Sequence, residues 1–239
     1  MNTKLRWFVV VLFAAAMAWV EAAVVLYLRV FLDRIQPYQA DPLPAGFGFA
    51  GAELVREAAT MVMLGAVGWL AGTERRTRLG YALLAFGAWD IFYYVFLVPL
   101  SGWPRSLLDW DILFLIPVPW WGPVLAPVSI AALMILAGTA IAQLQPKGLP
   151  FWPRPPAWLV SLGGASLALY TFMVDALRLI PAGPGAVRDV LPASFNWLLF
   201  AFALVLMSAP VVDLAMQYWI PPCVGIELED RRGTVVKTG

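Results

Sequence analysis

Six long apolar segments constrain the fold of this chain more than any other feature. Each is roughly 20 residues or longer, the length of α-helix that crosses the hydrocarbon core of a bilayer. Of the 239 residues, 62% are hydrophobic and 13% are charged, whereas about a quarter are charged in an ordinary soluble domain. The sequence therefore predicts an all-α, polytopic integral membrane protein with six transmembrane helices. These helices are expected at residues 5–32, 49–71, 79–98, 112–142, 157–180 and 194–219.

The fourth apolar segment contains closely spaced prolines that a regular helix does not accommodate. They are Pro117, Pro119, Pro123 and Pro127. Each removes a backbone donor and clashes with the preceding turn of a helix, so we predict that helix 4 is kinked or broken by them. Two explanations are open. The irregular backbone lines a wet binding cavity, or it forms an interfacial start to the helix that is anchored by Trp120 and Trp121.

The distribution of basic residues predicts the orientation of the chain in the membrane. Positively charged loops stay in the cytoplasm, and the densest basic loop is residues 74–78. With six spans, both termini fall on the same side as this loop. We therefore predict a multi-pass protein of a bacterial-type plasma (inner) membrane, with both termini cytoplasmic. Residues 1–220 are expected to form a single transmembrane domain, and residues 221–239 a short cytoplasmic tail.

The chain has no histidine and one cysteine, which excludes several classes of site. It cannot supply histidine ligands to haem or zinc, or a Ser-His-Asp triad, so no self-ligated haem or zinc is expected. A metal ion would have to be a hard divalent cation with oxygen ligands. The net charge of +1 leaves no basic stripe for nucleic acid. The expected partner is the lipid bilayer, with other membrane subunits in one interpretation.

Three carboxylates, Glu21, Glu57 and Asp90, lie inside the first three apolar segments. A carboxylate at bilayer depth is unfavourable by several kcal/mol unless it has a partner, a proton, an ion or water. At 1.5 Å per residue, all three fall about 12 to 17 Å below the outer surface. We therefore expect them to converge on an outward-facing acidic intramembrane pocket, and to be the ligands if a metal ion binds. The alternative is a structural network of hydrogen bonds with arginine or tyrosine.

Other polar residues near these carboxylates extend the candidate site. Some have simpler explanations: acids are favoured at helix N-termini, which accounts for Glu53, and loop arginines often pair with loop acids. Arginine without lysine on the outer side instead favours two-pronged binding of carboxylate or phosphate. No catalytic residue is predicted. The candidate ligand-binding residues are Glu21, Glu53, Arg56, Glu57, Asp90, Tyr94, Arg105, Asp109 and Asp111.

Three functions are compatible with these patterns. The favoured one is binding or transport of a cation, an amine or a small polar solute in the acidic pocket. The second is an accessory subunit of a larger respiratory or transport complex, whose buried acids contact another chain. The third is a histidine-free enzyme acting on a lipid or lipid-phosphate, with Glu57 or Asp90 as general base and Arg56 and Arg105 holding phosphate. No catalytic motif supports the third function, so whether the protein is an enzyme stays open.

Overall fold

The computed structural model describes residues 2–40, 50–115, 117–144 and 152–219 of the chain. Within these ranges the protein is mostly helical, and six helices are long and apolar enough to cross a membrane. The protein is therefore a multi-pass membrane protein, which confirms the predicted class. The predicted tail, residues 221–239, lies outside the described residues.

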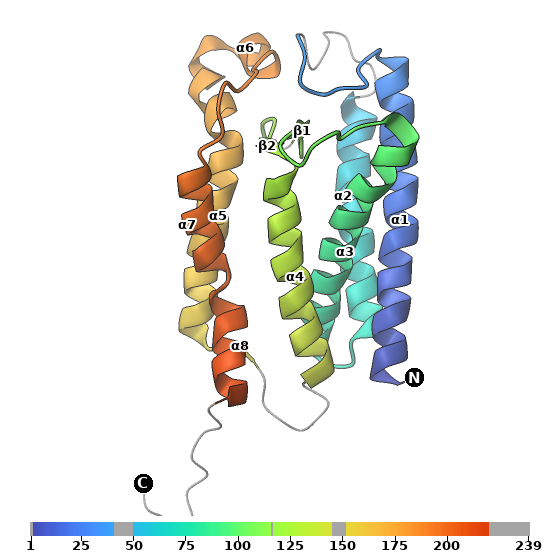
Figure 1. Cartoon of the computed structure of the whole chain (residues 1–239), viewed down its shortest axis with the longest axis vertical. Coiled ribbons are helices and arrows are strands. Elements are labelled where there is room, and N and C mark those ends of the chain that lie inside the picture. Colours follow the sequence, from blue (N-terminus) through green and yellow to red (C-terminus); the bar gives the residue numbers. More distant parts are fainter. Residues whose placement is uncertain (1, 41–49, 116, 145–151, 220–239) are drawn as a thin grey trace, which may run out of the picture.

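Figure 1 shows the helices running roughly parallel to the long axis, with a small β-hairpin at one end. We call this the hairpin end. The sixth span consists of two consecutive helices, α7 and α8, which meet at Ser208. The elements are α1 (Thr3–Phe31), α2 (Ala50–Ala71), α3 (Arg75–Ser101), β1 (Trp110–Ile112), β2 (Trp121–Pro123), α4 (Leu125–Leu144), α5 (Pro155–Leu179), η2 (Ile180–Ala182), α6 (Pro184–Arg188), α7 (Trp197–Met207) and α8 (Ala209–Trp219).

The start of the fourth span differs from the prediction. The helix α4 begins at Leu125, whereas the apolar run predicted a helix from residue 112. Pro117, Pro119 and Pro123 precede α4, and Pro127 lies in its first turn, where a missing backbone N–H leaves no helical hydrogen bond unmade. The prolines therefore lie in the hairpin region and at the helix start. A kink within α4 stays a prediction.

The β-hairpin occupies the space that the predicted first turns of helix 4 would have filled. Strands β1 and β2 are antiparallel, with Asp111 opposite Gly122. A Cβ atom at Gly122 would lie 2.8 Å from the ring of Phe172 on α5, so a residue without a side chain is needed at this close approach. The hairpin thereby packs against α5 and holds Asp111 among the helices.

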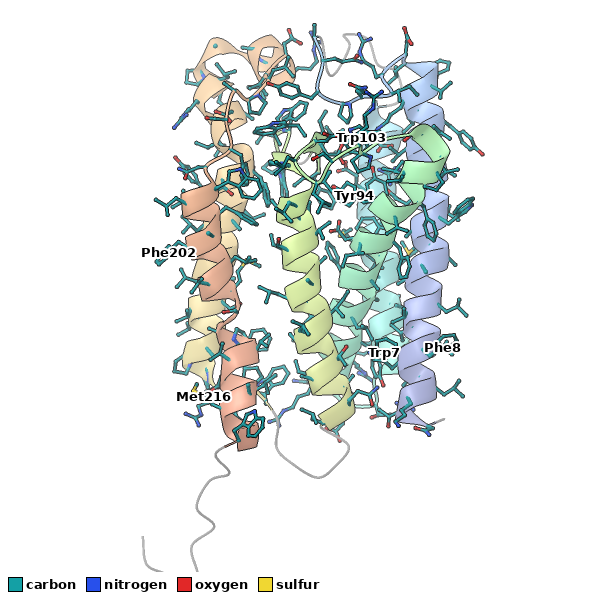
Figure 2. All side chains as sticks on the ribbon, viewed as in Figure 1. Trp7, Phe8, Tyr94, Trp103, Phe202 and Met216 are labelled. Atoms are coloured by element: carbon teal, nitrogen blue, oxygen red, sulfur yellow. The ribbon has the colours of Figure 1, made fainter. Side chains whose placement is uncertain are left out.

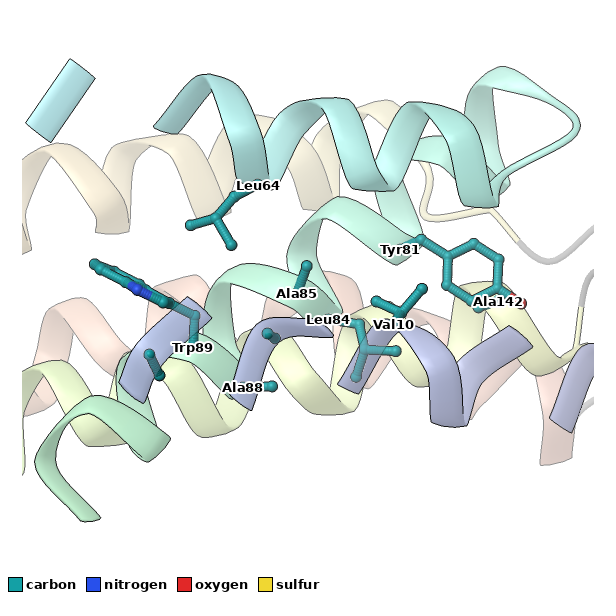
Figure 3. Packing of buried hydrophobic residues seen from close by; sticks show 10 residues of the cluster. Val10, Leu64, Tyr81, Leu84, Ala85, Ala88, Trp89 and Ala142 are labelled. Atoms are coloured by element: carbon teal, nitrogen blue, oxygen red, sulfur yellow. The ribbon is translucent and has the colours of Figure 1, made fainter. Parts of the chain in front are cut away.

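Helix α3 is the centre of the first half of the molecule, since it packs against α1, α2 and α4. The packing is close because small residues face one another. On α1 these are Ala14, Ala18 and Ala22, all fully buried. Figure 3 shows the resulting cluster between α1, α2 and α3, with Leu84 and Ala88 among its members.

Helices α5 and α7 pack against each other and form the second half with α8. This half meets the first through the hairpin and through contacts of α4 with α7 and α8. Large apolar side chains elsewhere point outward from the bundle, as Figure 2 shows for Phe8 and Phe202. Exposed apolar residues along every span are typical of helices that face lipid.

The start of α1 and the α2–α3 connection lie together at the end opposite the hairpin (Figure 1). This arrangement is the one that the basic-residue pattern requires. Which end faces the cytoplasm stays a prediction.

Candidate functional site

A cavity of about 400 Å³ lies inside the bundle, and residues of the hairpin are part of its lining. Helices α1, α2 and α3 and the hairpin form one wall, and α4, α5 and Met207 of α7 form the other. Seven of the nine predicted site residues line it. They are Glu21, Glu53, Arg56, Glu57, Asp90, Tyr94 and Asp111.

The guanidinium of Arg56 lies between two carboxylates on the α1–α2 side of the cavity. Its Nε donates to Oε2 of Glu53 at 2.9 Å, its Nη2 pairs with Oε1 of Glu53, and its Nη1 pairs with Oε1 of Glu21. The hydroxyl of Thr60 donates to Oε2 of Glu21 at 3.3 Å. Since residues 53, 56 and 60 share one face of α2, the helix presents this network to α1. Glu21 is therefore a partnered carboxylate.

Glu57 lies on the same face of α2 but has a much weaker partner. Its side chain is buried, with 8% of the residue exposed. Among the described residues, its one hydrogen-bond donor is the backbone N–H of Leu115, which donates to Oε2 at 3.4 Å. A buried carboxylate usually accepts several short hydrogen bonds, so Glu57 retains most of its capacity to bind a donor.

A second network joins the hairpin to α1 and α3. Asp111, 1% exposed, accepts a hydrogen bond from Nη2 of Arg29 at 2.9 Å and one from the hydroxyl of Tyr94 at 3.2 Å. The guanidinium of Arg29 also lies 4.3 Å from the ring centroid of Trp103, a cation–π contact. Figure 2 shows Tyr94 and Trp103 close together near the hairpin end. The network therefore fixes the hairpin over the cavity.

Two opposing effects act on the Asp111 carboxyl. Burial raises its pKa above the ordinary value, while the Arg29 guanidinium and the hydrogen bonds from Ile112 and Tyr94 act to lower it. The net direction is upward. We attribute this to the removal of the carboxyl from water, which disfavours the charged form.

Asp90 is the carboxylate with the fewest contacts in the cavity wall. It lies one turn before Tyr94 on α3 and interacts electrostatically with Asp111. It makes no hydrogen bond or ion pair with any residue that the structure describes. Nearby donors are also unused: the indole N–H groups of Trp89 and Trp120, both in the lining, have no acceptor within the described ranges.

The structure does not bring Arg105 and Asp109 to the cavity, contrary to the sequence-based site. The Asp109 carboxylate instead accepts hydrogen bonds from the backbone N–H groups of Arg105 at 2.7 Å and Ser106 at 3.3 Å. An aspartate that caps nearby backbone N–H groups stabilises a turn. These residues therefore shape the loop that precedes the hairpin.

The three carboxylates inside the first three spans line one cavity but do not form one group. Glu21 and Glu57 belong with Arg56, whereas Asp90 lies near Asp111. Within the described residues, no group of three or more Asp, Glu or Cys side chains is placed to hold a metal ion. The metal-ligand set Glu21, Glu57 and Asp90 is therefore not assembled.

Sequence reasoning missed several residues of this site. Arg29 lies on the same face of α1 as Glu21, at the i+8 position, and this spacing was the available signal. Thr60 follows Glu53 and Glu57 on the face of α2 in the same way. The apolar wall of α4 and α5 carries no comparable signal, because its residues resemble those of any lipid-facing helix.

Comparison with known proteins adds no assignment to this geometry. No family model, no curated protein and no solved structure matches the chain.

Proposed function

We propose that this protein binds an organic ammonium ion in the cavity, with the Asp90 carboxylate as the main counter-ion. The observation that carries the proposal is the lack of a hydrogen bond or ion pair between Asp90 and any described residue. A carboxylate at this depth that lacks a protein partner favours a bound cation or a proton.

The balance of charge in the lining supports a cationic ligand. Five carboxylates and three guanidinium groups line the cavity. Arg56 is committed to Glu21 and Glu53, and Arg29 to Asp111. Glu57 and Asp90 have no ion pair with a described arginine, so an ammonium group near them would meet uncompensated negative charge.

The rest of the lining favours an organic cation over a metal ion. Hard metal ions require several oxygen ligands together, and no such group is assembled in the described part of the chain. Aromatic rings line the cavity beside Asp90, including Trp89, Tyr93 and Tyr94. Such rings attract ammonium ions and pack against an apolar body. A volume of about 400 Å³ is within the range of small-molecule sites.

Binding of phenethylammonium to the purified protein tests this proposal. Calorimetry on wild type and on Asp90→Asn, which keeps the shape and removes the charge, should show about a tenfold or greater loss of affinity in the variant. Wild-type affinity should fall as the pH is lowered from about 8 to about 5, because protons compete for the carboxylates.

The matched control is Asp175→Asn, which removes an α5 carboxylate that is absent from the cavity lining. It should bind phenethylammonium as wild type does. The neutral analogue phenethyl alcohol should bind weakly to all three proteins. Equal, pH-independent affinities of wild type and Asp90→Asn would make the acids structural, and the accessory-subunit interpretation would then become the first choice.

A further inference from the structure

The two walls of the cavity differ completely in polarity. Every charged side chain in the lining comes from the α1–α3 and hairpin side. On the opposite wall, α4, α5 and α7 contribute only apolar side chains, among them Ile130, Met134, Ala165, Leu169 and Met207. A small hydrophilic amine would leave this second wall without a partner.

The charged residues of the lining extend from the hairpin end toward the middle of the bundle. Arg29 lies in the last turn of α1, and Asp111 lies in the hairpin itself, so these charges are at the hairpin end. Met134 lies about 14 Å into α4 from its start, and Ala165 about 21 Å from the end of α5. By the same count Asp90 lies about 17 Å from the end of α3. The carboxylate and the apolar wall are therefore at similar depths and face each other across the cavity.

Helices α2 and α5 both contribute residues to the cavity lining. Helix α2 packs against α1 and α3, and within the described residues it makes no substantial contact with α5. Met61 of α2 and Leu169 of α5 nevertheless both line the cavity. Leu169 is also 36% exposed, so it belongs to both the cavity wall and the outer face of the helix.

We propose that the ligand is a single-chain amphiphile with a cationic headgroup, which enters from the bilayer between α2 and α5. Its ammonium group lies by Asp90, and its chain lies against Met134, Ala165 and Met207. This inference rests on the proposed binding of an ammonium ion. It adds that the ligand has a hydrocarbon chain and that it enters from the bilayer. Recognition is directed mainly at the headgroup, because a chain gains little on moving from lipid to an apolar cavity.

The probe is dodecylammonium with bromine on a carbon close to the ammonium group, added to the protein in lipid nanodiscs. Bromine quenches tryptophan fluorescence, and Trp89 and Trp120 line the cavity. The correspondingly brominated dodecanol measures quenching that arises from partitioning into the bilayer alone. Wild type should show stronger quenching by the brominated ammonium than by the brominated alcohol. Phenethylammonium should abolish this excess quenching, because it competes for the same site.

The informative variant is Ala165→Phe, which fills part of the apolar wall of the cavity without adding a tryptophan. It should weaken binding of brominated dodecylammonium about tenfold or more and weaken calorimetric binding of phenethylammonium by a clearly smaller factor, because the shorter ligand contacts less of this wall. Leu162→Phe, on the lipid-facing side of the same helix, is the control and should bind both ligands as wild type does. If Ala165→Phe no longer binds phenethylammonium, the smaller Ala165→Leu replaces it with the same expectation.

The outcomes separate this inference from the proposed function. One outcome is that wild type binds phenethylammonium while its tryptophan fluorescence is quenched equally by the brominated ammonium and the brominated alcohol. That result would exclude an amphiphile as the ligand and leave the proposed binding of an ammonium ion intact. Brominated dodecylammonium binding that is equally strong in wild type and Ala165→Phe would place the chain elsewhere and overturn the inference. Failure of wild type to bind either ligand would overturn the proposed function itself.

Discussion

At the scale of single residues, Arg56 explains how two carboxylates persist in a membrane-spanning region. It contacts Glu53 with both prongs of its guanidinium and Glu21 with its remaining terminal nitrogen. Lysine would supply a point charge without this planar geometry. The cluster is therefore an assembled ion-pair network that ties α2 to α1.

We expect Arg56→Ala to destabilise the protein more than most single substitutions. The change leaves Glu21 and Glu53 largely buried without their counter-ion, and breaking a buried pair from one side destabilises by about 3 kcal/mol or more. Thermal unfolding in detergent should show a clearly lower midpoint than for wild type. The unfolding midpoint of Arg56→Lys should fall between those of Arg56→Ala and wild type, because lysine keeps the positive charge without the two-pronged contact.

Arg178→Ala is the matched control for this prediction. Arg178 also pairs with an acid three residues away, Asp175, at 3.7 Å, but its side chain is 71% exposed. An exposed pair of this kind contributes about 0.5 kcal/mol or less, so its midpoint should stay close to that of wild type. Similar midpoints for Arg56→Ala and Arg178→Ala would show that the Arg56 network contributes little to stability.

Residue spacing could predict which side chains share a helix face, but not which of them pair. Glu53, Arg56 and Thr60 follow from the period of α2. The contact between Arg29 and Asp111 joins residues 82 positions apart, and it depends on the hairpin replacing the first turns of a predicted helix. Spacing also does not indicate which acid will cap its own loop. Asp109 does so by accepting hydrogen bonds from the backbone N–H groups of Arg105 and Ser106.

At the scale of elements, length and apolarity were sufficient to predict the six spans. They were insufficient at the start of α4, where most of residues 112–124 are as apolar as those of a membrane-spanning helix. The prolines were the evidence for irregular backbone, but proline only excludes the regular helix and does not specify what replaces it. The hairpin forms because residues 110–112 pair with residues 121–123. Hydropathy gives no information about such backbone pairing.

The contact between α3 and α4 gives a prediction at this scale. A Cβ atom at Gly87 would lie 2.5 Å from the carbonyl oxygen of Ala131 and 2.9 Å from Cγ1 of Ile135. Gly87→Ala should therefore force the two helices apart and destabilise the protein by about 1 to 3 kcal/mol, as overpacking does. The measurement is the midpoint of thermal unfolding in detergent.

Gly163→Ala is the control, since a Cβ atom there would meet nothing within 4 Å. It lies within α5, where alanine is favoured over glycine by about 0.5 to 1 kcal/mol. The two variants should therefore shift the midpoint in opposite directions. An unchanged or higher midpoint for Gly87→Ala would mean that α3 and α4 approach less closely than this geometry requires.

At the scale of the whole molecule, the cavity exists because the two halves are joined mainly along α4 and the hairpin. The charged lining comes from the side of α1, α2, α3 and the hairpin, and α4, α5 and α7 supply an apolar wall. Counting residues along each apolar segment could predict that the acids lie at similar depths. It could not predict that α5 lies opposite them, because the α5 residues in the cavity lining are all apolar and no charge in the sequence marks that contact.

The orientation of the bundle gives the last prediction. Arg75, Arg76 and Arg78 lie at the end opposite the hairpin, and basic loops of this kind remain cytoplasmic. In intact cells, and in a background with Cys223 replaced by serine, a membrane-impermeant thiol reagent should label Ser106→Cys without permeabilisation. Thr73→Cys, exposed in the α2–α3 connection, should react only after permeabilisation. The reverse pattern would invert the protein in the membrane, and the cavity would then draw its ligand from the cytoplasmic leaflet.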